Sequence, residues 1–301
     1  MKRSFNHKSR KAFLTAAICL ALSQSVFAMP TGGKVVDGTV TGIVNGTVSS
    51  GGTINVNSNA LIDWTKFGID KGETLNFKFG QDYLNVINHV TGSEMSQLLG
   101  TLNAKNGNVY LINPKGILVG GGAHIDAGSL FLSTLDATDD QLMGIYKPDT
   151  GNFDLASKKD SQGLTIQNGA NIQVGTFLGL LGNKVQIADN VTISDTPYDK
   201  DDTTFVVAAA DSACFYPHSL ISVTTKQGNA VDIGATKFNI NNEYTDTYIL
   251  GNDIKMTGTN LNINSRNSKV SSTALDINRV RRTMKMSSLE SIEKIISISQ
   301  V

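Results

Sequence analysis

Apolar and polar residues alternate along most of the chain from residue 35 onward. This period of two is typical of β-strands, in which successive side chains point to opposite faces. Each alternating stretch covers only about three to five residues and ends at Gly, Asn or Asp. The alternating positions are Ile54/Val56, Leu75/Phe77/Phe79, Leu164/Ile166, Ile172/Val174, Val185/Ile187, Val191/Ile193, Val231/Ile233, Phe238/Ile240 and Leu261/Ile263. The pattern predicts an all-β protein built from many short strands.

The amino-acid composition indicates frequent sharp turns and a substantial hydrophobic core. The chain has 29 glycines and many asparagines, the residues that best tolerate left-handed backbone conformations. Apolar residues make up 40% of the sequence, enough for a substantial core, which argues against disorder. Predicted turns lie at Asn45-Gly46, Gly51-Gly52, Asn106-Gly107, Gly120-Gly121-Gly122 and Asn168-Gly169.

Short strands can form either an antiparallel sandwich or a parallel β-helix, and an internal repeat helps to distinguish these architectures. The segment Gly122–Leu130 recurs as Gly169–Phe177, with the shared pattern G-A-x-I-x-x-G-[S/T]-apolar and an offset of 47 residues. Two turns of a solenoid with rungs of about 20–25 residues would produce this offset. Antiparallel hairpins in a sandwich remain an alternative, but the repeat favours a parallel β-helix.

Three segments depart from the alternation. In residues 93–104, Ser93 can cap a short helical turn that places Met95, Leu98 and Leu99 on one face. Residues 139–160 are polar and are predicted to be a loop or an excursion from the coil. Residues 266–301 form a basic tail whose last part, 279–301, resembles an amphipathic helix. This tail is interpreted either as a cap or as the product of a truncated reading frame.

The N-terminus has the features of a secretory signal peptide. Five basic residues without any acid precede an apolar run, Phe13 to Leu22, that is too short for a stable membrane anchor. The segment ends at Val26-Phe27-Ala28, with small residues at the positions that signal peptidase requires. We predict that residues 1–28 are removed by cleavage after Ala28.

Cleavage changes the charge and the cysteine count of the mature chain. Removal of the five basic residues leaves 21 basic residues against 26 acidic ones, so the mature protein is acidic. An acidic surface argues against nucleic acid as a partner. Only Cys214 remains, so an intramolecular disulfide is impossible, and this residue is predicted to be a buried small hydrophobe.

A search for catalytic and metal-binding patterns gave no strong candidate. The densest acidic group, Asp199 to Asp202, fits a solvated turn better than a Ca²⁺ site. The histidines of the mature chain, His89, His124 and His218, lack a second ligand at metal-site spacing. No Gly-x-Ser-x-Gly motif is present, and Trp64 is expected to pack against a cap. We predict no catalytic site, metal or cofactor.

Residues 60–136 carry a specific resemblance. The ordered motifs are 62–69 (IDWTKFGI), 72–77 (GETLNF), 88–92 (NHVTG), 96–102 (SQLLGTL), 107–118 (GNVYLINPKGIL) and 128–136 (GSLFLSTLD). In this order and spacing they resemble the secretion domain of filamentous-haemagglutinin-like exoproteins, the cargo of two-partner secretion. Weaker similarity in composition and strand pattern extends from about residue 30 to residue 265.

The resemblance implies a right-handed parallel β-helix with a non-helical N-terminal cap over residues 29–265. It also implies recognition in the periplasm by the soluble domains of an outer-membrane β-barrel transporter. The family's asparagine motifs fall here on Asn88, Thr91 and Gly92, and on Asn113-Pro114-Lys115-Gly116. In the second motif Pro114 fixes φ, Gly116 allows a positive φ, and Asn113 can close a turn. Lys115 stands where the family usually has a second Asn.

These observations lead to three hypotheses. In the main one, the protein is a secreted two-partner-secretion exoprotein of the adhesin or haemagglutinin type, found outside a diderm bacterium or on its surface. Its further partner would be a host-cell receptor or glycan. The second is the N-terminal carrier part of a contact-dependent toxin. The third is a β-helix polysaccharide lyase or hydrolase, although the carboxylates such enzymes need were not found.

Overall fold

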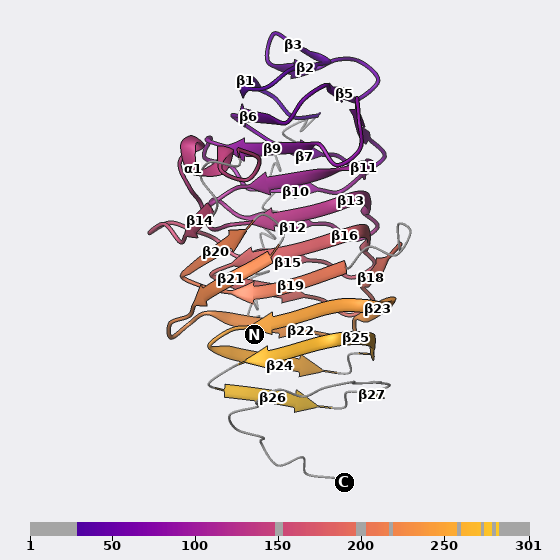
Figure 1. Ribbon diagram of the computed structural model, residues 1–301, viewed down its shortest axis with the longest axis vertical. Helices are drawn as coiled ribbons and strands as arrows, with labels where there is room; N and C mark the ends of the chain where they lie inside the picture. Colours follow the sequence, from indigo (N-terminus) through magenta and orange to yellow (C-terminus); the bar gives the residue numbers. More distant parts are fainter. Residues whose placement is uncertain are drawn as a thin grey trace, which may run out of the picture.

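The computed structural model describes residues 29–147, 153–196, 203–216, 219–257, 260–271, 274–278 and 281–282. Within them the chain is almost entirely β, as predicted, and winds into a tall stack of rungs with the N-terminal strands at one end (Figure 1). The predicted signal peptide 1–28 with its cleavage site at Ala28, the acidic segment Asp199–Asp202 and His218 lie outside the described residues.

Two long sheets form the walls of the stack. Apart from the antiparallel β1 and β2 of the cap, neighbouring strands within them are parallel. Parallel crossovers of this kind are right-handed in nearly all proteins, and the expected right-handed parallel β-helix is confirmed. The first sheet comprises β1 (Lys34–Asp37), β2 (Val40–Thr41), β5 (Thr53–Val56), β6 (Ala60–Trp64), β8 (Thr74–Phe79), β9 (Asn85–Val90), β11 (Thr101–Ile112), β13 (His124–Ser133), β16 (Asn171–Gly182), β18 (Thr192–Asp195), β19 (Thr203–Ala209), β23 (Lys237–Leu250), β25 (Asn260–Ser271) and β27 (Arg281–Arg282). The second comprises β7 (Gly68–Ile69), β10 (Ser96–Leu98), β12 (Ile117–Val119), β15 (Leu164–Ile166), β17 (Lys184–Ile187), β22 (Ala230–Ile233), β24 (Asp253–Thr257) and β26 (Ala274–Asn278).

The alternation seen in the sequence becomes columns of buried side chains inside the coil. In the second sheet, each inward residue lies directly on its equivalent in the next rung and is at most 2% exposed. This column contains Ile69, Leu98, Val119, Ile166, Ile187, Ile233 and Met256. Continuous apolar contact between rungs buries surface that a single rung could not bury alone.

The register corrects the interpretation of the repeat. His124 pairs directly with Asn171, so the two copies lie in adjacent rungs rather than two rungs apart. An ordinary rung is shorter, since Ser96 pairs with Ile117 at an offset of 21 and Val231 pairs with Ile254 at an offset of 23. The predicted rung length is therefore right, but the repeat spans one rung enlarged by an excursion of about 25 residues.

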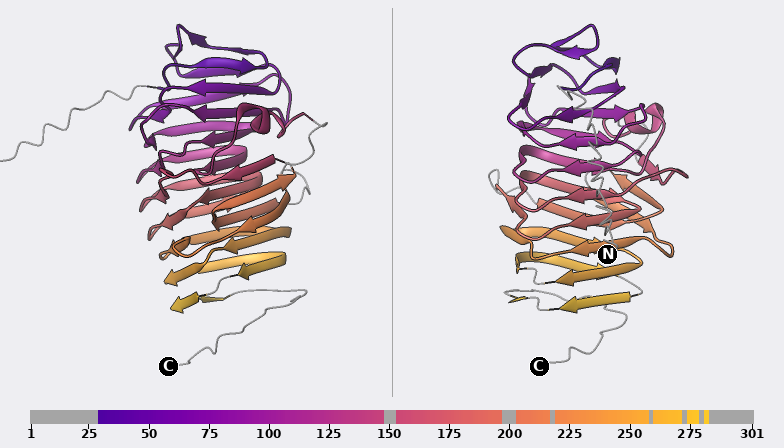
Figure 2. Two further views of the ribbon diagram at one scale, coloured as in Figure 1. Left: turned by 90° about the vertical axis from the view of Figure 1, so that its left-hand side faces the viewer. Right: turned by 180° about the vertical axis from the view of Figure 1, so that it is seen from behind.

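The excursion packs on the outside of the coil. The segment that was expected to be a loop or an excursion, residues 139–160, contains helix α1 (Asp139–Met143) and β14 (Phe153–Ala156) among its described residues. Strand β14 pairs with β20 (Ser212–Tyr216), and β20 with β21 (Ser219–Thr224), in a small antiparallel sheet. These elements gather along one side of the stack (Figures 1 and 2).

A second core lies between the excursion and the outer face of the first sheet. Its rings make edge and stacked contacts, with Phe131 and Phe215 5.2 Å apart and Phe153 and Phe215 5.4 Å apart between centroids. Phe131 pairs with Tyr110 in the ladder of β11 and β13. One face of the coil is thus covered, and its strands are apolar on both sides there.

Two other expectations about the chain are wrong. Residues 93–104 form no helical turn, because Ser96–Leu98 is strand β10, held between β7 and β12, and Thr101 begins β11. Cys214 is half-exposed rather than buried, since it lies on the outer face of β20 opposite Asp154.

Strands also occur beyond residue 265, within the predicted basic tail, and β27 lies in the part, 279–301, that was expected to be helical. Strands β25, β26 and β27 continue the parallel ladders of β23 and β24. The remainder of the predicted tail, residues 283–301, lies outside the described residues.

The N-terminal cap closes one end of the coil with short strands. The hairpin of β3 (Ile43–Val44) and β4 (Thr47–Val48) and the antiparallel pairs of β1 and β2 replace the parallel ladder there. Trp64 is fully buried beneath the cap, as predicted, and Gly33 packs so closely on its ring that a Cβ would lie 2.5 Å from it. No helix within the described part of the chain is long and apolar enough to cross a membrane.

Candidate functional site

The first asparagine motif lies inside the folded coil. Asn88 is on β9 and its side chain is fully buried. Its Oδ1 accepts a hydrogen bond from Trp64 Nε1 at 3.0 Å, and its Nδ2 donates to the Tyr110 carbonyl at 3.1 Å. The amide therefore bridges three successive rungs, β6, β9 and β11, and satisfies the only polar atom of the buried indole.

The end of the same motif requires a close approach between rungs. The Thr91 amide donates to the Trp64 carbonyl at 2.9 Å, and its hydroxyl donates to the same oxygen at 3.3 Å. Gly92 lies against the Thr65 carbonyl, so that a Cβ on Gly92 would be 1.9 Å from that oxygen. Only glycine fits this position without displacement of the backbone.

The second motif is a turn closed by a buried amide. The Asn113 Oδ1 accepts from the Lys115 amide at 2.9 Å, and its carbonyl accepts from the Gly116 amide at 3.1 Å. Gly116 has φ of 111°, the left-handed region that was expected at this position. The turn occurs where β11 passes to β12, so the predicted turn geometry is found in the structure.

The two motifs are neighbours in space. Asn113 Nδ2 donates to the Glu94 carbonyl at 3.0 Å and to Ser96 Oγ at 2.9 Å, both just beyond Gly92 in the sequence. Asn88 and Asn113 are both fully buried, whereas Pro114 and Lys115 are half-exposed and Thr91 is exposed. The rungs thus bring the predicted residues together, but they turn the asparagine side chains away from solvent.

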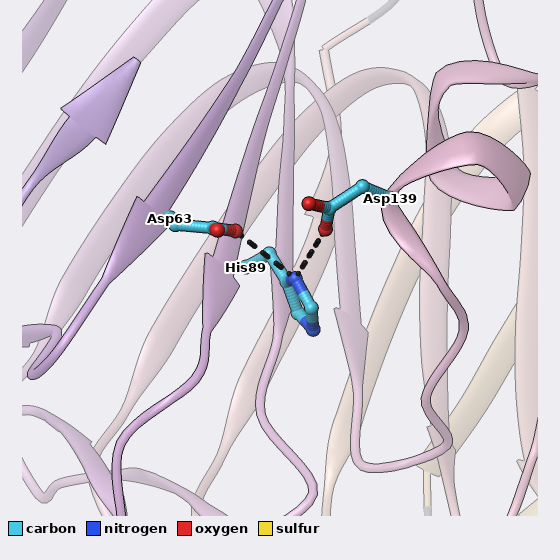
Figure 3. A group of neighbouring side chains, drawn as sticks. All are labelled: Asp63, His89 and Asp139. Carbon is cyan, nitrogen blue, oxygen red and sulfur yellow. Dashed lines mark hydrogen bonds and ion pairs between the residues drawn. The ribbon is translucent and has the colours of Figure 1, made fainter. Parts of the chain in front are cut away.

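A cluster of ionisable side chains surrounds the residue after Asn88 (Figure 3). His89 Nδ1 lies 3.2 Å from Asp63 Oδ1 and 3.1 Å from Asp139 Oδ1. Its other nitrogen, Nε2, lies 3.0 Å from Asp136 Oδ1. Asp63 is the ladder partner of His89 on β6, and Asp139 begins α1, whose N-cap Thr138 forms a capping box with Gln141. The cluster therefore links the coil to the excursion.

Burial and neighbouring charges shift the pKa values of His89 and Asp136 in opposite directions. Burial alone would lower the pKa of His89, but the hydrogen bond to Asp136 and the three surrounding carboxylates raise it above its ordinary value. Burial and the nearby Asp139 raise the pKa of Asp63. Burial would also raise the pKa of Asp136, but hydrogen bonds from His89 and Lys158 lower it. These shifts favour an imidazolium that donates from both nitrogens.

Sequence reasoning missed this cluster because its members are distant along the chain. Asp63, Asp136 and Asp139 are separated from His89 by 26, 47 and 50 residues. A ladder partner such as Asp63 could be found once the rung register is known. Asp136 and Asp139 follow only from the path of the excursion, which no periodicity predicts.

Comparison with known proteins gives a family. The family described as TPS secretion domain, for two-partner secretion, matches residues 27–282. A heme/hemopexin-binding protein of Haemophilus influenzae is 35% identical over 129 residues, which cover 41% of this chain and 14% of that protein. A second H. influenzae protein of the same name is 38% identical over 104 residues, covering 34% of this chain and 11% of that protein. The similarity thus spans only a small part of these relatives, which are named for binding rather than for catalysis.

A solved structure shares the fold. The secretion domain of HMW1 from Haemophilus influenzae superimposes with a TM-score of 0.59 at 22% identity, covering 85% of this chain and 76% of that one. The family match includes both asparagine motifs and most of the coil. The chain therefore belongs to the TPS secretion-domain family, whose members are exported through the periplasm and across the outer membrane by a transporter partner and are then released or held at the cell surface.

Proposed function

We propose that the transporter's periplasmic domains recognise the segments around Asn88–Gly92 and Asn113–Gly116 before the chain folds. The observation that supports this order is the burial of both asparagine amides. Each amide is fully buried and hydrogen-bonded to neighbouring rungs in the folded coil. A partner that contacts these side chains must therefore meet them while the rungs are apart.

The same residues then acquire a second role outside the cell. Once rungs stack, Asn88 joins β6, β9 and β11, and Asn113 closes the turn between β11 and β12. Each added rung extends the apolar columns and buries more surface, which favours folding over return of the chain to the periplasm. Export is thereby coupled to β-helix formation.

We further propose that the exported protein acts by binding, as an adhesin or haemagglutinin does, with a host-cell receptor or glycan as its target. The support is the resemblance of residues 60–136 and the binding role in the names of the relatives. Because the similarity covers at most 14% of those relatives, the ligands in their names are not assigned to this chain.

A pair of asparagine variants tests recognition separately from stability. Asn229 is 2% exposed, and its side chain also closes a turn, accepting from the Lys226 amide at 2.7 Å and donating to the Asn183 carbonyl at 3.1 Å. Asn113→Ala and Asn229→Ala should both lower the free energy of unfolding, by about 1–3 kcal/mol each, because buried partners lose hydrogen bonds.

The amount of secreted protein should differ between the two variants. With the transporter present, we expect Asn113→Ala to lower the amount of protein in the medium by at least about tenfold, a difference of about 1.4 kcal/mol in the recognition step. Asn229→Ala should be exported at close to the wild-type level. If secretion of both variants falls in proportion to their loss of stability, the motif is only a structural turn and the proposal is wrong.

A further inference from the structure

The cluster around His89 has the composition and geometry of a metal site. We propose that Asp63, His89 and Asp139 bind one divalent transition-metal ion of the Zn²⁺ type, which fastens helix α1 to the coil. The three ligand atoms, one imidazole nitrogen and two carboxylate oxygens, all lie within 4.8 Å of one another. They come from three different elements, β6, β9 and α1, that converge at this point (Figure 3).

The contact distances match those between ligands of a common metal. Ligand atoms at about 2.0–2.2 Å from Zn²⁺ are separated from each other by roughly 2.8–3.6 Å in tetrahedral or octahedral geometry. Nδ1 of His89 lies 3.2 Å from the nearest Asp63 oxygen and 3.1 Å from the nearest Asp139 oxygen. An ion could replace the proton on Nδ1 without a large movement of these side chains.

The surroundings of the imidazole are those of a metal-bound histidine. Its Nε2 faces Asp136, whose side chain is only 4% exposed and forms an ion pair with Lys158. A carboxylate on the far nitrogen fixes the ring orientation and leaves the near nitrogen directed at the metal, as in most protein metal sites. Asp136 is thus a positioning residue, with its own charge balanced by Lys158.

Charge and access also suit a divalent cation. With Asp136 paired to Lys158, the two carboxylates of Asp63 and Asp139 converge on a single ring nitrogen. The Asp139 side chain is 38% exposed and that of Asp63 is 23% exposed, so an ion can enter and water can complete its coordination. An imidazole ligand favours Zn²⁺ or Ni²⁺ over Ca²⁺, which prefers oxygen ligands.

The site would exist only in the folded protein. Its ligands are separated by 26 and 50 residues, so an extended chain offers no preformed site. Metal binding would therefore stabilise the coil and the attached excursion after export, without contributing to the unfolded chain.

Calorimetric titration of the folded, chelator-treated protein with ZnCl₂ tests the proposal. We expect one saturable site per chain and a rise in Tm of about 5 °C at a hundredfold excess over Kd. Asp139→Asn and Asp63→Asn should each weaken binding at least about tenfold. Asp140→Asn is the matched control. Asp140 is exposed and is not one of the three ligands, and its substitution removes the same charge from the first turn of α1.

Nitrogen NMR of the His89 ring gives a readout that does not depend on the fold of a variant. Zn²⁺ should shift the Nδ1 resonance of the wild type and leave Nε2 protonated. NiCl₂ should compete with Zn²⁺, and CaCl₂ should not. The proposal is overturned if Zn²⁺ shows no saturable binding below about 100 µM (a free energy weaker than about −5.5 kcal/mol), if Asp139→Asn binds as well as Asp140→Asn, or if Nδ1 does not shift.

Discussion

At the scale of single residues, the geometry of the coil depends on a few close contacts between rungs. Gly92 is the sharpest case, because a Cβ there would lie 1.9 Å from the Thr65 carbonyl. We expect Gly92→Ala to destabilise the fold by more than about 3 kcal/mol, since neither backbone can move without breaking the ladder. Chemical denaturation measures this loss.

Gly80→Ala provides the control for Gly92→Ala. A Cβ on Gly80 would lie 3.5 Å from its nearest neighbour, Asn57, which is an ordinary contact distance. Its effect should stay within about 1 kcal/mol, the usual range for a glycine-to-alanine exchange. Equal effects of the two substitutions would show that the rungs separate at Gly92 more easily than the structure indicates.

The reactivity of the Cys214 thiol also depends on the residues around it. Burial and the adjacent Asp154 raise the pKa of the Cys214 thiol to about 11, so little thiolate exists at neutral pH. Alkylation by iodoacetamide should therefore be slow at pH 8 and rise steeply as the pH approaches 11. Asp154→Asn removes the repelling charge and should shift the rate profile to lower pH. A profile that Asp154→Asn leaves unchanged would contradict this assignment.

How far the sequence predicts the site depends on whether its residues are near one another along the chain. The turn at Asn113–Gly116 is a local motif, and Pro114 and Gly116 predict it correctly. The burial of the Asn113 side chain is not local, because Ser96 and Glu94 come from the preceding rung. Partners of this kind are visible only when the register between rungs is known.

At the scale of elements, the excursion and the hairpin of β20 and β21 pack together on the coil through a core that includes several aromatic rings. Phe215 on β20 is fully buried against Phe131 and Phe153. Phe215→Ala should cost about 3–5 kcal/mol through lost burial and a cavity. Because the coil has its own core, the loss should fall first on β14, β20 and β21.

Hydrogen exchange distinguishes this local effect from global unfolding. In Phe215→Ala, amides of β14 and β20 should lose protection while those of β12 and β15 keep it. Tyr216→Ala is the control, since Tyr216 is the next residue on the same strand and is 54% exposed. Simultaneous loss of protection in the coil would show that the two cores form one cooperative unit.

The excursion also explains why the strands and the rung length were predicted correctly from the sequence but the number of rungs between the two repeats was not. The strands and the rung length follow from alternation, which the inward columns require. The offset of 47 residues was interpreted as two rungs because the excursion adds about as many residues as one rung contains. Similarly, Met95, Leu98 and Leu99 suit a helical face, but pairing with β7 and β12 makes the segment a strand.

At the scale of the whole molecule, the fold suits a chain that crosses a membrane extended and folds afterwards. Each rung contacts mainly the rungs beside it, and the family match extends over residues 27–282. The predicted cleavage after Ala28 would leave Cys214 as the sole cysteine, so that no intramolecular disulfide could form before export. The proposed recognition motifs, whose asparagine side chains are buried in the folded coil, fit the same sequence of events.

The most direct test of this account is secretion of the chain with and without its outer-membrane transporter. The chain should appear in the medium or at the cell surface, folded and resistant to protease, only when the transporter is present. Without the transporter it should remain in the periplasm. Equal export in both strains, or retention in the periplasm despite a functional transporter, would contradict the claim that the matched residues 27–282 form a transporter-recognised export domain.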